Sequence, residues 1–290
     1  MTDEDALLSA IAAHPDEDTP RLAYADWLDE NDRHIRAEFI RVQIDITQKE
    51  TLPRVLQNRY VDVWKRNQEL LDNHRGELLG PLAALPADTR IEFRRGFVSF
   101  VALPVNEFLR HSVMLAGMRP LPRVRVTRVA GHLLPFLMNP DTGCVAELRA
   151  YSDEPDDEPP RYPDDLDLID GIERLSRLEV LELEGCGIND LHLDLAFNFS
   201  LPALVELDLS ANQITDEGLG NLLRTDFPRQ LKRLVLGGNP LTDRGAIALA
   251  QQWPTGAEDR LEDLNLRFTD IGQPSHEALT ARFGGRVVLF

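Results

Sequence analysis

"LVELDLSANQITDEGLGNLL" (Leu204–Leu223) is the stretch of sequence that decides the fold. Leu207 and Leu209 are two residues apart, so on a β-strand their side chains point to one face while the residues beside them point to the other. Asn212 follows where the strand ends, and apolar residues then recur at helical spacing up to Leu223. The stretch therefore predicts a short strand followed by a helix.

The same spacing returns elsewhere in the chain. Units with this pattern start at residues 178, 204, 231 and 261. Successive starts are 26, 27 and 30 residues apart. Asn239 takes the position of Asn212 in the third unit, while Cys186 and Thr269 take it in the first and the fourth. A fixed period of this length indicates a solenoid, because one unit cannot bury its apolar face alone whereas stacked units can.

The spacing matches L-x-x-L-x-L-x-x-[N/C]-x-L, and the chain resembles bacterial leucine-rich-repeat proteins with ribonuclease-inhibitor-like repeats. The resemblance covers most of the C-terminal half. It implies the α/β class, as a right-handed β-α leucine-rich-repeat solenoid, here preceded by a small all-helical N-terminal domain.

Local chemistry supports the strand–helix unit. The amide of Asn212 can hydrogen-bond to backbone groups that a bending chain leaves unpaired. The sequences "TDEG" (215–218) and "TDRG" (242–245) have the composition of helix starts, with Thr or Asp as caps. The apolar residues expected to face the core from these helices are Leu219, Leu222, Leu223, Ile247 and Leu249.

The first fifty residues differ in kind. Thr2 with Asp5 resembles a capping box, and Thr19 followed by Pro20 is typical of a helix start, with Thr19 as the N-cap. The segment "AHPDEDTPRLAYADWLDENDRHIRAEFIRVQ" (13–43) resembles the bacterial repeat-companion domain, a module of unknown function that precedes repeat arrays. The residues that carry this resemblance are His14, Pro15, Asp18 to Leu22, Tyr24 to Leu28, Arg36 to Arg41 and Gln43. The resemblance implies an architecture and no activity.

These features divide the chain into three predicted parts. Residues 1–50 form the helical repeat-companion domain, residues 51–95 form a helical connector that caps the array, and residues 96–290 form the solenoid. Within the solenoid, residues 96–177 are degenerate repeats and 178–290 regular ones. The Pro-rich acidic segment 153–163 is expected to be a solvated loop.

Composition limits the function. A net charge of −18 and a pI near 4.8 argue against nucleic acid and anionic membranes, because both require clustered Lys and Arg. The N-terminus has no export signal, and the chain has no long apolar run, so a cytoplasmic protein is expected. Cys144 and Cys186 are the only cysteines, which suits a reducing compartment.

No motif for nucleotide, metal or nucleophilic chemistry occurs in the sequence. We therefore expect no catalytic residue, no cofactor and no metal, and a protein that is not an enzyme. One alternative stays open: an enzyme or ligand-binding regulator whose site lies in the N-terminal helical module around His14, Asp26 and Glu38. A regulatory domain detached from a larger signalling system is a further hypothesis. The sequence does not distinguish it from a non-enzymatic recognition or scaffold protein.

What remains is the concave strand face of the solenoid, which repeat arrays commonly use to bind partners. Its polarity runs from apolar through basic and acidic to mixed, a pattern that an extended protein or peptide could read in register. The expected partner-binding residues are Tyr151 as an aromatic anchor, Glu182, Glu184, Glu206, Asp208, Arg233, Asn265 and Arg267. The basic cluster on this face is Arg123, Arg125 and Arg149, which could hold an acidic group or pair with nearby carboxylates. The protein is expected to bind as a monomer.

Overall fold

A computed structural model describes residues 2–50, 61–129, 132–149, 174–196 and 201–289. The chain forms two compact units. The first unit comprises Met1–Leu103 and His111–Val124, and the second comprises Pro104–Arg110 and Arg125–Phe290. The acidic loop expected at 153–163 and the candidate Tyr151 lie outside the described residues.

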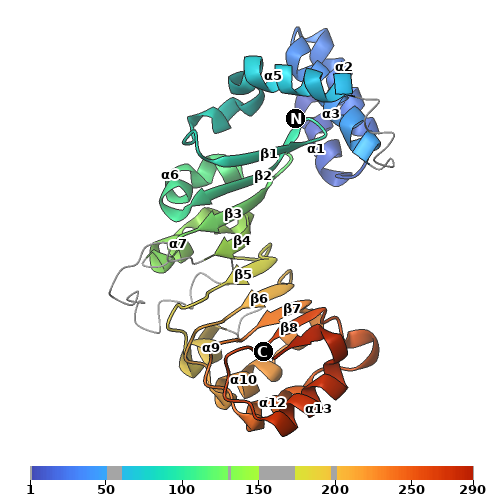
Figure 1. Cartoon of the computed structure of the whole chain (residues 1–290). Helices are drawn as coiled ribbons and strands as arrows, with labels where there is room; N and C mark the ends of the chain where they lie inside the picture. The colour runs from blue at the N-terminus through green and yellow to red at the C-terminus, as the bar shows by residue number, and fades with distance from the viewer. Residues whose placement is uncertain (1, 51–60, 130–131, 150–173, 197–200, 290) are drawn as a thin grey trace. The chain divides into compact units, whose positions relative to one another are not determined.

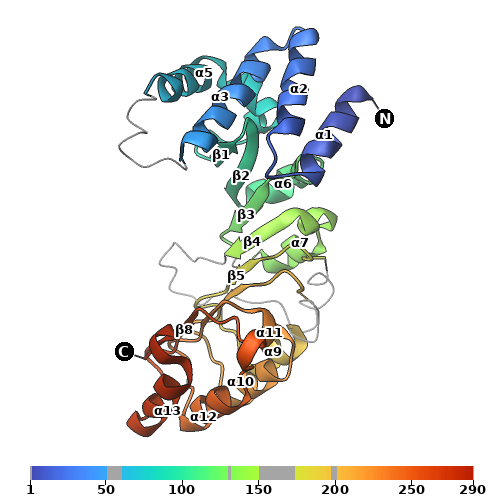
Figure 2. The same ribbon diagram turned by 90° about the vertical axis from the view of Figure 1, so that its right-hand side faces the viewer.

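The first unit is helical apart from strands at its C-terminal end (Figure 2). Its elements are α1 (Asp3–Ala13), α2 (Thr19–Glu30), α3 (His34–Glu50), α5 (Val61–Leu79), the 3₁₀ helix η2 (Gly80–Ala84), β1 (Arg90–Arg94) and β2 (Phe97–Pro104). Three of the described elements contribute residues to both units: β2, through Pro104, α6 (Val105–Ala116) and β3 (Arg123–Thr127). Helix α5 is kinked at His74, which has non-helical dihedral angles.

The start of α1 agrees with the sequence, and the start of α2 differs by one residue. Thr2 Oγ1 accepts from the Asp5 N–H at 3.1 Å while Asp5 Oδ2 accepts from the Thr2 N–H at 2.8 Å, so the capping box is confirmed. Thr19 as the N-cap of α2 was wrong. The cap is Asp18, because its carbonyl already accepts from the Leu22 N–H at 2.9 Å, and Thr19 is the first helical residue.

The core of the first unit joins helices to strands. Ile40 on α3 belongs to a cluster that includes Tyr24, Leu28 and Phe97 of β2. Phe39, on the other side of α3, makes an edge-on contact with Phe93 of β1, with ring centroids 5.1 Å apart. The helices therefore share their apolar interior with an antiparallel β1–β2 hairpin that the sequence did not predict. The predicted domain boundaries at residues 50 and 95 stay a prediction.

The second unit is a strand–helix solenoid (Figure 1). Its strands are β4 (Val145–Arg149), β5 (Val180–Glu182), β6 (Glu206–Asp208), β7 (Arg233–Val235), β8 (Asp263–Asn265) and β9 (Val287–Val288). Its helices are α7 (Leu133–Met138), α9 (Asp190–Ala196), α10 (Asp216–Leu223), α11 (Phe227–Gln230), α12 (Asp243–Gln252) and α13 (Gln273–Phe283), with short 3₁₀ turns η3 (Pro140–Cys144), η4 (Gly256–Glu258) and η5 (Gly284–Arg286). From β4 to β9 each strand pairs in parallel with the next one in the chain.

Equivalent leucines stack inside this unit. Leu181 lies opposite Leu207 in the sheet register, Leu207 opposite Leu234, and Leu234 opposite Leu264, and all four are buried. The helices pack in the same order, α9 on α10, α10 on α12 and α12 on α13. One predicted core residue is wrong: Ile247 on α12 is 44% exposed.

Buried asparagines connect successive repeats. Asn212 Nδ2 donates to the carbonyls of Leu209 in its own repeat and Leu183 in the preceding one, at 3.0 and 2.8 Å. Its Oδ1 accepts from the Ile188 N–H at 2.9 Å. Asn239 makes the equivalent bonds one repeat later. The expected role of this position, satisfying the bending backbone, is confirmed.

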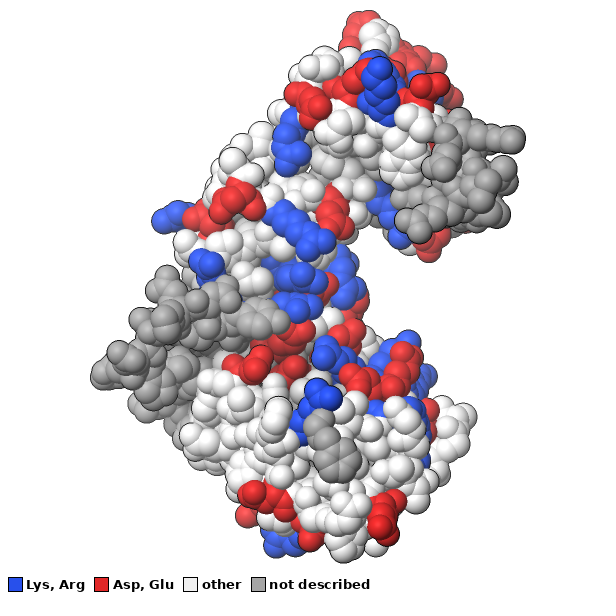
Figure 3. All heavy atoms as spheres, in the orientation of Figure 1, with Lys and Arg blue, Asp and Glu red and all other residues white. Residues whose placement is uncertain are grey.

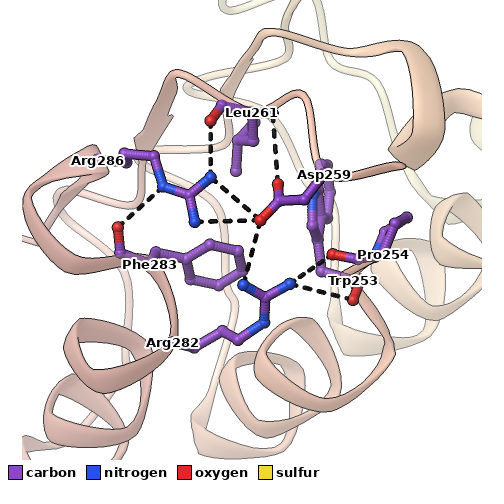
Figure 4. Close-up of polar contacts among 7 residues, drawn as sticks. All are labelled: Trp253, Pro254, Asp259, Leu261, Arg282, Phe283 and Arg286. Atoms are coloured by element: carbon purple, nitrogen blue, oxygen red, sulfur yellow. Dashed lines mark hydrogen bonds and ion pairs between the residues drawn. The ribbon is translucent and has the colours of Figure 1, made fainter. Parts of the chain in front are cut away.

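The last helix is held by a half-buried ion cluster (Figure 4). Asp259 Oδ2 accepts from Arg282 Nη1 at 3.2 Å and from both Nη atoms of Arg286 at 3.1 Å. Arg286 also donates to the Leu261 carbonyl at 2.8 Å, which joins the end of α13 to the approach of β8. The cluster fixes the final turn of the solenoid onto the repeat before it.

Candidate functional site

The face of β4–β8 opposite the buried leucines is the strand face, and its charged residues form two rows. The sheet register places Glu147, Val180, Glu206, Arg233 and Asp263 in the first row. It places Arg149, Glu182, Asp208, Val235 and Asn265 in the second. Figure 3 shows the corresponding mixture of basic and acidic atoms over these strands.

At the β4–β5 end the rows are tied by ion pairs. Arg125 Nε contacts Glu147 Oε2, and Arg149 Nη2 lies 3.5 Å from the same oxygen. Arg149 Nη1 donates to Glu182 Oε2 at 2.8 Å. Two residues of the predicted basic cluster, Arg125 and Arg149, are thus engaged with carboxylates of their own face, while Arg123 lies at the start of β3, in the first unit.

Glu182 differs from the other candidate acids. Glu182 is only 8% exposed and forms an ion pair with Arg149, so its carboxylate stabilises the sheet and is little accessible to a partner. The predicted residue therefore lies on a strand of this face, but its side chain is buried. Glu184, two residues further on, is exposed.

Towards β8 the face is more open. Arg233 is half-buried between two acids, with Nη1 3.8 Å from Glu206 Oε2 and Nε 3.2 Å from Asp263 Oδ2. Asp208 Oδ1 accepts from the N–H and the hydroxyl of Ser210 at 2.9 and 2.5 Å. Asn265 accepts from the N–H of Arg267 at 3.0 Å, and the side chain of Arg267 is exposed.

The turns that follow the strands hold a residue that sequence reasoning missed. Phe268 is 86% exposed and has φ = 58°. The residues at the same place in the preceding repeats are Gly185, Ala211 and Gly238, with φ of 64°, 55° and 70°. Aligning the repeats by their starting residues shows a large side chain at a position that is otherwise Gly or Ala. The sequence does not show that the backbone there is left-handed.

The residues of the alternative N-terminal site each have another partner. His14 Nδ1 lies 3.2 Å from Glu17 Oε1, Asp26 pairs with Arg41 at 2.7 Å, and Glu38 pairs with Arg66 at 2.6 Å. Within the described residues, no group of three or more His, Cys, Asp or Glu side chains has metal-site geometry. Across that same part of the chain, no helix combines the length and apolarity that crossing a membrane requires.

Comparisons with known proteins support the repeat assignment. A leucine-rich-repeat family model matches residues 201–223 and 229–250. Among solved structures, an internalin from Listeria monocytogenes is similar over 57% of this chain and 39% of its own, at 17% identity and a TM-score of 0.35. The chain therefore spans well under half of that protein's length. No curated protein matches the chain.

Proposed function

We propose that this protein is a non-enzymatic recognition protein that binds a protein or peptide partner on the strand face of its second unit. Leucine-rich repeats in general support protein–protein interaction, and repeat arrays present an extended strand surface suited to it.

Phe268 is the observation that carries this proposal. A non-glycine residue in the left-handed region costs about 1–2 kcal/mol, and a phenyl ring in water contributes no burial to offset that cost. Aromatic side chains, Phe among them, are enriched in protein interfaces relative to the rest of the surface. We therefore propose Phe268 as an aromatic anchor, while the same role for Tyr151 stays a prediction.

The charges of the strand face indicate the partner's chemistry. Glu184 is exposed, and Glu206 and Asp208 are half-buried, while Arg233 already lies between two carboxylates of the face. The regular repeats thus present more negative than positive charge on this side. A partner segment with Lys or Arg side chains and one apolar residue, placed to meet Phe268, would complement it.

The groups that could perform chemistry support the non-enzymatic part. Cys144 and Cys186 are both buried. Burial, with a smaller contribution from Asp141, raises the pKa of the Cys144 thiol to about 11, so it is protonated at neutral pH and a poor nucleophile.

The test is affinity capture from lysate of the source organism, read by quantitative mass spectrometry. The strand-face variant carries Glu184→Arg, Glu206→Arg and Asp208→Arg, and a second variant carries Phe268→Gly. The matched control reverses three exposed acids of the helix side, with Glu217→Arg, Asp226→Arg and Glu277→Arg. It changes the net charge equally and leaves the strand face intact. Glu182 is left unchanged because its reversal would break the ion pair with Arg149 and confuse folding with binding.

A protein retained by the wild type and the control, but lost from both strand-face variants, is the expected result. Retention by all four baits, or by none, contradicts recognition at this face.

A further inference from the structure

The first unit encloses a cavity of about 430 Å³. Its walls come from α1, α2, α3, the end of α5, η2, β2 and residues 118–120, all within that unit. The lining is mostly apolar, with Leu8, Leu78, Phe97 and Met118 among its members. This volume is within the range of about 300–1,000 Å³ typical of small-molecule sites.

A guanidinium group lines this cavity. Arg36 on α3 donates from Nη1 to the carbonyl of Leu78 at 2.6 Å, and its Cζ lies 5.4 Å from the ring centroid of Phe97. Among the described residues, Arg36 has no carboxylate in an ion pair, unlike Arg41 and Arg66 of the same unit. A guanidinium has five N–H donors, and the Leu78 carbonyl accepts one of them.

The surroundings of Arg36 make its charge costly. Burial lowers the pKa of the Arg36 guanidinium, and it outweighs the opposing effects of Tyr24 and of the Glu77 carboxylate. Removing an ionised group from water is unfavourable when no carboxylate is in direct contact with it. An anion in the cavity would supply both the missing charge and acceptors for the remaining donors.

The charges of the walls indicate how many negative charges the cavity would take. Arg33, Arg36 and Arg119 line it, and Glu77 is the acid among its lining residues. Arg33 is held at 2.5 Å by Glu4, which also accepts from the Tyr24 hydroxyl at 2.7 Å. Three arginines against these two carboxylates leave one positive charge, which matches a monoanion better than a phosphate dianion.

We propose that this cavity binds a small organic carboxylate. Its carboxylate accepts two parallel hydrogen bonds from Arg36, and its aliphatic or aromatic body lies against the apolar walls at Leu8, Phe97 and Met118. The ligand enters where the cavity meets solvent, at the exposed residues Glu77, Gly80 and Arg119. This site is separate from the strand face and does not depend on the proposed recognition function.

The experiment is isothermal titration calorimetry on the full chain with defined probes. 3-Phenylpropionate tests the proposal, its neutral amide isolates the contribution of charge, and phenyl phosphate tests the competing anion. We expect the carboxylate to bind, the amide to bind at least about tenfold more weakly, and phenyl phosphate to bind more weakly than the carboxylate. Equal binding of acid and amide, no binding of the acid, or tighter binding of phenyl phosphate would overturn the proposal.

Variants then locate the site. Arg36→Lys keeps the positive charge and loses the planar fork, so binding of 3-phenylpropionate should weaken about tenfold; Arg36→Met should weaken it about 10- to 100-fold. Arg66→Lys is the matched control, because Arg66 is paired with Glu38 and does not line the cavity. If Arg36→Met unfolds, Arg36→Lys decides, with circular dichroism verifying its fold. Unchanged binding by a folded Arg36→Lys contradicts the assignment.

Discussion

The Asp216 carboxylate accepts hydrogen bonds from both the backbone N–H and the hydroxyl of Thr242, at 2.9 and 2.5 Å. Asp216 begins helix α10, and Thr242 caps the helix of the next repeat. Asp190 and Thr215 repeat the arrangement one unit earlier, at 2.8 and 2.5 Å. The starts of α10 and α12 are thus each capped by a Thr of their own repeat, and that Thr is in turn hydrogen-bonded to the Asp of the previous repeat.

This arrangement explains the Gly of "TDRG" and gives a first prediction. A Cβ on Gly245 would lie 2.4 Å from Asp216 Oδ1, so Gly245→Ala must displace the carboxylate and should lower the free energy of unfolding by about 1–3 kcal/mol. Gly220→Ala on α10 is the control, since its Cβ would meet nothing within 4 Å. It should raise the free energy of unfolding by about 0.5–1 kcal/mol. Urea unfolding measures both, and equal effects would show that the close approach to Asp216 is unimportant.

Asn239 gives a second prediction. Replacing it with Ala removes two bonds donated to the carbonyls of Leu209 and Leu236 and one accepted from the Ile214 N–H. At about 0.5–1.5 kcal/mol for each bond, the free energy of unfolding should fall by about 2–4 kcal/mol. Asn265→Ala loses one side-chain hydrogen bond, accepted from the Arg267 N–H, and should cost about 1 kcal/mol or less. Thermal and urea unfolding measure the stability of both variants. Equal stability of the two would contradict the stabilising role of the Asn239 hydrogen bonds.

Asp259 gives a pH-dependent prediction. Burial by itself raises the pKa of its carboxyl, but hydrogen bonds from Arg286 and Arg282 outweigh burial and lower it. A pKa lowered in the folded state means that the stabilisation is present above the unfolded pKa, near 4, and is lost as the pH falls through the folded value. Asp259→Asn should therefore be less stable than the wild type at pH 7, with the difference shrinking below about pH 4. A difference that stays constant from pH 7 to pH 3 would contradict the charged cluster.

Phe268 gives a prediction that separates stability from binding. Phe268→Gly relieves the left-handed backbone and should raise the free energy of unfolding by about 0.5–1 kcal/mol, less than the full strain because Gly also gains freedom when unfolded. The same substitution should weaken partner binding. Ala211→Gly makes the same backbone change at φ = 55° without removing an aromatic ring, so it should leave binding unchanged. Thermal unfolding and the capture experiment measure the two effects, and a destabilised Phe268→Gly would show that the ring packs usefully in the folded chain.

The regular repeats were predictable residue by residue because their signals are local. The spacing of Leu207 and Leu209, the Asn at 212 and 239, and the Thr caps at 215 and 242 each depend on neighbours within one repeat period. Ile247 failed because helical spacing shows which residues share a face, but it does not show where that face ends at the edge of the helix layer.

The candidate surface was predictable only in part. Alternation along a strand placed Glu182, Glu206 and Asp208 on one face, but the burial of Glu182 depends on Arg149, 33 residues earlier. The exposure of Phe268 likewise depends on the packing of the whole turn.

The sequence by itself determined the repeat period, the strand–helix order and the apolar interior of the solenoid, because these follow from periodic side chains and turn chemistry within about thirty residues. Only the tertiary structure decided which charges of the strand face neutralise one another, that the N-terminal helices close on the β1–β2 hairpin, and that Arg36 lines a cavity without a carboxylate partner. Those outcomes depend on contacts between side chains that are far apart in the sequence, and such contacts produce no periodic pattern in it.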